Sequence, residues 1–106
     1  MTVLEPVLLI NPARFDTKDV VTHSNVAWQN YYWLLIRFGS YGNWQSTVFI
    51  PTSVFAGSNQ GRRPEFIISN VVDISVWQNG NNSICIQSSD ANSIYEVGIY
   101  GVGAKV

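Results

Sequence analysis

Two glycine-containing stretches carry the side chains best suited to bind a ligand. The first, 39–44, contains Tyr41, Asn43 and Trp44, and the second, 57–63, contains Asn59, Gln60, Arg62 and Arg63. Aromatic rings stack on the apolar face of a sugar, amides hydrogen-bond its hydroxyls, and guanidinium groups bind a carboxylate or phosphate. These residue types therefore predict a binding surface for a neutral or weakly anionic glycan, built from the two loops.

A structural interpretation of the same residues stands beside this one. Trp44 can close the core of a hairpin instead of facing a ligand. Arg62 and Arg63 can form a solvated pair or a contact with another subunit. The sequence leaves both interpretations open.

The sequence lacks the residue patterns that are typical of catalysis. Asp16 and Asp19 are the closest pair of carboxylates, and two acids in a charged stretch are more often solvated than catalytic. His23 has no second metal ligand at a suitable spacing, so we expect an exposed loop histidine. Cys85 lies between two isoleucines, which predicts a small buried strand residue. We therefore expect no enzyme, no metal and no cofactor.

The composition narrows the class of protein further. The 106-residue chain has a net charge of −1 and only 12% charged residues, which predicts neither nucleic-acid binding nor attraction to an anionic membrane. A neutral, amide- and hydroxyl-rich surface is typical of extracellular or virion β-proteins. No signal peptide and no membrane-inserting segment is visible. The length predicts one domain, residues 1–106.

The elements that would position these residues are strands. The run 31–38 is apolar on both alternating faces, which predicts a core strand, and 44–50 is its antiparallel return. We expect Trp33, Leu35 and Phe49 to be mostly buried. Residues 72–78 alternate cleanly, so we expect Val72, Ile74 and Val76 to face inward and Asp73 and Ser75 to face outward. They lead into the turn signal Asn79-Gly80. With about seven or eight short strands and no helical periodicity, the chain predicts an all-β fold, an antiparallel, jelly-roll-like β-sandwich.

Two further expectations concern the loops of the chain and its large number of aromatic residues. Asn11 to Asp19 lacks period-two order and predicts a loop, as does the stretch from Thr52 to Arg63, with Val54 and Phe55 anchoring it to the core. Four tryptophans, five tyrosines and five phenylalanines exceed what one small sandwich usually hides. Part of that aromatic surface is therefore expected to lie in an interface between subunits.

The C-terminal two-thirds of the chain resembles a known class of domain. The closing segment Ile94 to Val102 resembles the strand that often ends the distal domains of tailed-phage tail fibres and related receptor-binding proteins. As in those domains, a Trp- and Asn-Gly-containing hairpin, Ile74 to Asn81, and a strand ending in proline, Val48 to Pro51, precede it. The resemblance implies a non-catalytic fibre-tip domain of the virion, extracellular and usually homotrimeric. Such a domain binds a host cell-surface glycan or outer-membrane protein.

Two alternatives to the fibre tip follow from the same features. A lectin-like carbohydrate-binding module would use exposed rings and neutral amides in the same way. A structural capsid or decoration protein would use the aromatic surplus for assembly alone. A monomer that binds sugar would favour the first, and an oligomer that binds only virions would favour the second.

Overall fold

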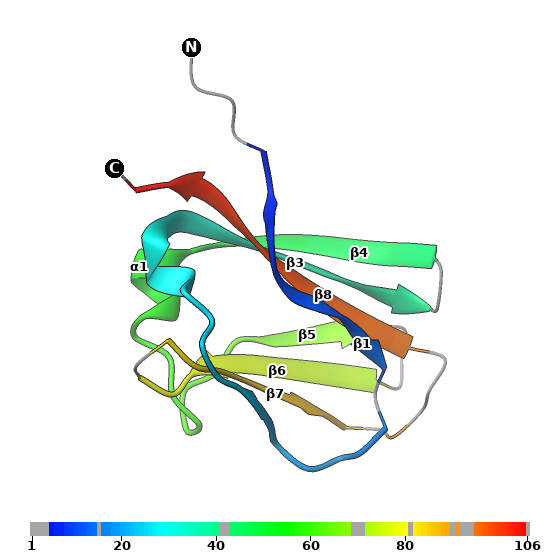
Figure 1. Ribbon diagram of the computed structural model, residues 1–106. Helices are drawn as coiled ribbons and strands as arrows, with labels where there is room; N and C mark the ends of the chain where they lie inside the picture. Colours follow the sequence, from blue (N-terminus) through cyan, green and yellow to red (C-terminus); the bar gives the residue numbers. More distant parts are fainter. Residues whose placement is uncertain are drawn as a thin grey trace.

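The chain folds into two four-stranded antiparallel sheets that pack face to face (Figure 1). The computed structural model describes residues 5–14, 16–40, 43–68, 72–80, 82–89, 91 and 95–105. The first sheet has the order β1 (Val7–Arg14), β8 (Tyr95–Ala104), β3 (Tyr31–Ser40), β4 (Asn43–Pro51). The second has the order β2 (Val21–His23), β7 (Ile84–Ser88), β6 (Val72–Gln78), β5 (Glu65–Ile68). The predicted all-β sandwich is confirmed.

The first two strands of the chain pair with the last two. β1 pairs with β8 in one sheet, and β2 pairs with β7 in the other, so that the first and last strands lie side by side as in a jelly roll. A 3-10 turn, η1 (Trp28–Asn30), leads into β3, and a single helical turn, α1 (Thr52–Phe55), follows β4. Both turns lie at the end of the sandwich that holds the chain termini (Figure 1).

Three even-numbered residues of β3 form the centre of the core. Leu34, Ile36 and Phe38 are almost completely buried between the sheets. The prediction that Trp33 and Phe49 are mostly buried is wrong, because these side chains are 44% and 54% exposed, whereas Leu35 is buried as predicted. The run 31–38 is apolar at both its odd and its even positions. The alternation of side chains along a strand therefore could not show which set of side chains faces the second sheet.

The alternation in β6 predicts its faces correctly. Ile74 and Val76 are fully buried and Asp73 is exposed, as expected, although Ser75 on the outward side is also buried. Cys85 in β7 is a buried free thiol, which confirms its predicted setting. The side chain of Val72 lies outside the described residues.

Two stretches expected to be loops contain regular structure. β1 runs through Arg14 because its pairing with β8 accommodates Asn11 and Pro12 with register shifts on either side of Ile10. A proline is tolerated there because β1 is an edge strand. In α1, Phe55 is fully buried against Trp28 and anchors the stretch as expected, whereas Val54 is exposed.

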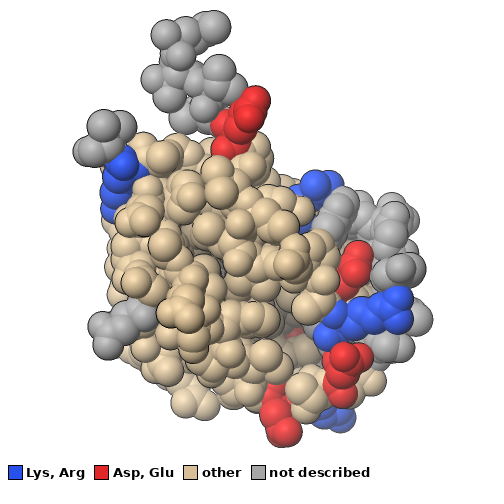
Figure 2. Space-filling model, in the orientation of Figure 1, with Lys and Arg blue, Asp and Glu red and all other residues tan. Residues whose placement is uncertain are grey.

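The two ends of the sandwich differ in their elements and in their charge. The β3–β4 hairpin lies at one end, and α1, the segment that follows it and both termini lie at the other (Figure 1). Figure 2 shows most charged side chains of that view at the hairpin end. On the face drawn there, the opposite half shows charged side chains only near the termini.

Candidate functional site

The structure does not bring the two predicted ligand-binding loops together. Tyr41 lies outside the described residues, and Asn43 and Trp44 begin β4, with side chains that the structure does not describe. The predicted residues of the second loop, 57–63, follow α1, beyond Pro51 at the far end of β4. Asn43 and Pro51 are the two ends of the nine-residue strand β4, eight steps apart, which is about 26 Å at about 3.3 Å per residue. The predicted surface is therefore two separate regions.

The segment after α1 is anchored by hydrogen bonds to the end of β6. The Ser58 hydroxyl donates to the carbonyl of Phe55 over 2.6 Å and accepts from the backbone N–H of Gln78 over 3.0 Å. The side-chain amide of Gln78 in turn donates to the Ser58 carbonyl over 3.0 Å. A buried serine and a glutamine therefore hold residues 56–63 against the second sheet.

Asn59 shapes the tip of this segment. Its Oδ1 accepts hydrogen bonds from the backbone N–H groups of Gly61 and Arg62 at 2.8 and 2.9 Å. The backbones of Asn59 and Arg62 also bond to each other in both directions at 3.0 Å. A side-chain acceptor two residues before a glycine is typical of a tight turn. Asn59 therefore fixes the backbone, and its amide nitrogen is the group left to face a ligand.

Arg63 covers the outer face of the second sheet. Its guanidinium lies 5.0 Å from the ring centroid of Trp77, and its Nη1 donates to Gln87 Oε1 over 2.8 Å. Its Nε lies 3.8 Å from a carboxylate oxygen of Glu65. Because Val76 points into the core, Trp77 points outward, and Arg63 is one reason that it is nonetheless buried. Arg62, in contrast, is exposed.

A hollow of about 260 Å³ opens beside this cover. Its most buried lining side chains, Trp77 and Cys85, form the floor, and its rim carries exposed polar side chains. The lining residues are Val20, Thr22, Asn59, Gln60, Trp77, Gln78, Asn79 and Cys85. None of these eight described residues is charged. It offers amide and hydroxyl groups around an apolar floor, which is the composition expected of a site for a small neutral polar ligand.

The turn after β6 completes the rim. Gly80 and Asn82 have positive φ angles of 66° and 60°, and the N–H of Ser83 donates to the Gly80 carbonyl over 2.9 Å. The turn that Asn79-Gly80 predicts is therefore present, and it places Asn79 next to Asn59 and Gln60. Gln78 holds this turn as well, because its Oε1 accepts from the Gly80 N–H over 2.6 Å.

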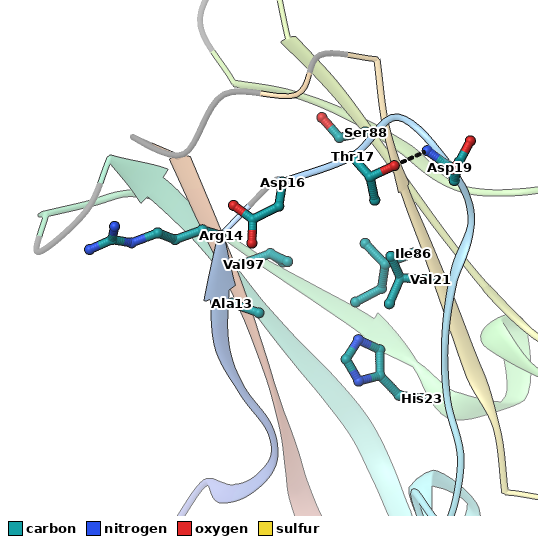
Figure 3. Close-up of a pocket in the computed structure, with 10 residues that line it drawn as sticks. All are labelled: Ala13, Arg14, Asp16, Thr17, Asp19, Val21, His23, Ile86, Ser88 and Val97. Atoms are coloured by element: carbon teal, nitrogen blue, oxygen red, sulfur yellow. Dashed lines mark hydrogen bonds between the residues drawn. The ribbon is translucent and has the colours of Figure 1, made fainter.

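A second hollow, of about 290 Å³, opens between β1 and β2 at the edge of the sandwich (Figure 3). Val21, Ile86 and Val97 provide its apolar wall, and the imidazole of His23 points into it, whereas the guanidinium of Arg14 points away. Burial lowers the pKa of His23 below its ordinary value, which favours the neutral ring. His23 is thus a half-buried strand residue, and the exposed loop position expected from the sequence is wrong.

The edge hollow has little chemistry of its own. Asp16 and Asp19 are exposed at its mouth, and Thr17 Oγ1 accepts a hydrogen bond from the Asp19 N–H over 3.0 Å. Within the described part of the chain, no three His, Cys, Asp or Glu side chains gather to hold a metal ion. Nor does any helix there have the length and apolar composition required to cross a membrane. The hollow over Trp77 is the better candidate for a binding site.

Comparisons of the chain with protein-family models, with curated proteins and with solved structures give no match. The geometry of the described residues is therefore the basis for a function.

Sequence reasoning found two of the residues around the hollow and missed the rest. Asn59 and Gln60 were predicted, but Trp77, Asn79 and Thr22 were not. The Asn79-Gly80 turn was visible in the sequence. Its position beside residues 57–63 depends on the bonds from Ser58 to Gln78, which no sequence pattern indicates.

Proposed function

We propose that the protein is a non-catalytic attachment domain of a virion, the receptor-binding tip of a phage tail fibre, which acts outside the cell as a homotrimer. Its ligand is a glycan of the host cell surface, with an outer-membrane protein as the other class of receptor. The observation that carries the proposal is the uncharged, amide-rimmed hollow over Trp77.

The groups around the hollow match the chemistry of a sugar. The amides of Gln60 and Asn79 are exposed at the rim, where each can both donate to and accept from a hydroxyl. The indole of Trp77, which is 3% exposed, lies in the floor below them. A volume of about 260 Å³ is just under the about 300–1,000 Å³ of drug-sized pockets, so a single sugar unit is the appropriate size of ligand.

Arg62 extends the same surface toward weakly anionic glycans. It is exposed immediately after the tip of the segment, where a carboxylate or phosphate beside the bound sugar would meet it. Arg63 serves a different purpose, because its guanidinium already contacts Trp77 and Gln87.

Binding to a glycan array and to host cells tests this function. Gln60→Ala and Asn79→Ala each remove about one net hydrogen bond, worth about 0.5–1.5 kcal/mol, so each should weaken binding about threefold to tenfold. Asn30→Ala, an exposed amide outside the hollow, is the matched control and should bind as the wild type. If no glycan or host cell is bound, or if both rim variants bind like the control, the proposal is wrong.

A structural capsid or decoration protein is the second candidate, because one observation favours it. The outer face of the first sheet exposes aromatic side chains that an assembled particle would cover. Such a protein would bind virions and no glycan. A lectin-like module would instead bind sugar as a monomer, so the array together with the molar mass in solution separates the three functions.

A further inference from the structure

The outer face of the first sheet is continuous and apolar over one half of its length. Cross-strand register places Leu35 beside both Phe49 and Tyr100, Trp33 beside Val102, and Leu8 beside Tyr100. All of these point away from the core, because their neighbours Leu34, Ile36 and Ile99 point into it. We name this surface the outer apolar face, formed by Leu8, Trp33, Leu35, Phe49, Tyr100 and Val102. Leu35 and Val102 are only 7% exposed, so the open part of the surface belongs to the other four side chains.

The outer apolar face has the size of the centre of a protein interface. An aromatic side chain has about 150–250 Å² of surface to bury, so half-exposed Trp33 and Phe49, together with Leu8 at 46% exposure, leave on the order of 300 Å² open. The largest apolar patch on a typical monomer is itself about 300–600 Å² and is often functional. A stable interface buries about 800 Å² per partner, with an apolar centre and a polar rim.

The geometry of the rings favours a protein as the occupant. Trp33 and Phe49 lie 6.4 Å apart with their planes at 86°. Two perpendicular rings cannot both lie flat against one extended sugar surface, whereas side chains of a protein can pack between them. The surface therefore differs in kind from a sugar-stacking platform.

The rim of the outer apolar face favours another copy of the same chain. Toward the hairpin end, the same outward rows continue with Arg37 on β3 and Glu96 on β8, and Glu96 is paired in register with Arg14 on β1. A rim that carries both signs of charge can meet its own copy without net repulsion. Most soluble oligomers are built from identical chains.

We propose that the outer apolar face is the subunit interface, covered by neighbouring copies of this chain. This inference rests on the homotrimer of the proposed function, but not on its glycan binding. In a trimer the three first sheets face the symmetry axis, and Trp33 and Phe49 pack at the centre. The second sheets, with the hollow over Trp77, then face outward and remain accessible to a receptor.

Light scattering on size-exclusion chromatography tests the interface. The wild type should have the mass of three chains, and Trp33→Lys and Phe49→Lys should each elute as single chains of about 11.8 kDa. Val54→Lys changes a side chain that is 62% exposed on α1, outside the outer apolar face, and should keep the wild-type mass. Circular dichroism should show all three variants folded, because each side chain is at least 44% exposed.

The outcomes separate this inference from the function itself. The single-chain variants should bind immobilised glycan with the single-site affinity of the wild type, since the hollow is on the other sheet, and lose only avidity. A wild type that is already a single chain at micromolar concentration overturns the interface, as does an unchanged mass of both Lys variants. Unfolding of both variants overturns it too, because it would place these side chains in the core. Loss of single-site binding in Gln60→Ala and Asn79→Ala alone does not contradict the interface.

Discussion

Trp33 and Trp77 occupy equivalent positions in the two sheets and have different surroundings. Each lies on an inner strand, and each points away from the core between the sheets. Trp77 is only 3% exposed, because Arg63 and the segment after α1 lie over it. Trp33 is 44% exposed, and within the described residues its ring contact is with Phe49, which is itself exposed.

The difference shows how a small sandwich uses its two outer faces. The second sheet is covered by its own chain, which leaves a polar hollow beside the cover. The first sheet has no such segment among the described residues, so its aromatic side chains are available to another molecule. In the proposed function, the outer face of the first sheet takes a partner and the outer face of the second sheet carries the ligand site.

The largest effect should come from the core side of β3, where Phe38 stacks on Phe66 with ring centroids 5.7 Å apart. Phe38→Ala should lower the free energy of unfolding by about 3–5 kcal/mol, because the side chain is almost completely buried. Phe49→Ala should cost much less, about 1 kcal/mol, in the Trp33→Lys chain, where subunit association does not contribute. Urea unfolding measures both. A cost for Phe49→Ala equal to that of Phe38→Ala would contradict the assignment of the inner and outer faces, and a larger one would reverse it.

The cover over Trp77 should have an intermediate effect. Arg63→Ala removes the contact with the indole and the hydrogen bond to Gln87, and should lower the free energy of unfolding by about 1–2 kcal/mol. Its contact with Glu65 adds little, because that carboxylate is largely exposed. Arg62→Ala, the matched control, should change stability by less than about 0.5 kcal/mol. The two variants behaving alike would show that Arg63 does not hold the cover in place.

The smallest effect should come from His23 at the edge between the sheets. Burial lowers its folded pKa, so the unfolded chain, with a pKa near 6.5, takes up the proton first as the pH falls. The stability contributed by neutral His23 should be complete above about pH 6.5 and decline below it, toward the folded pKa. Arg14, Asp16 and Asp19 line the same hollow. The slope of unfolding free energy between pH 7.5 and 5.5 should disappear in His23→Gln, and a slope that persists there would assign it to other groups.

The sequence contains enough information to predict the architecture, but not which face of each strand points into the core. Alternation in β6 and the Asn79-Gly80 turn predict their structure correctly, because each is a local pattern. The face of β3 could not be predicted, since Trp33 and Leu34 are both apolar and only packing against the second sheet distinguishes them. The burial of Trp77 depends on Arg63, a contact between distant parts of the chain.

The candidate site was predictable in part for a similar reason. Asn59 and Gln60 are in a loop of suitable composition, so their residue types alone identify them. The prediction that they share a site with Asn43 and Trp44 is wrong, because Asn43 and Trp44 begin β4 whereas Asn59 and Gln60 follow its other end. The partners that do surround the hollow, Trp77 and Asn79, are set by hydrogen bonds to the end of β6.

Fluorine NMR of protein labelled with 5-fluorotryptophan can measure how each outer face is covered. Trp77 on the second sheet should be covered by its own chain, and Trp33 on the first sheet by a neighbouring copy. Resonances of Trp33 and Trp77 are assigned by replacing each with Phe, and exposure is measured as the shift between H2O and D2O. In the wild type both residues should show small shifts, and in Phe49→Lys that of Trp33 should become large while that of Trp77 stays small. A large shift for Trp33 in the wild type, equal to that in Phe49→Lys, would contradict the account.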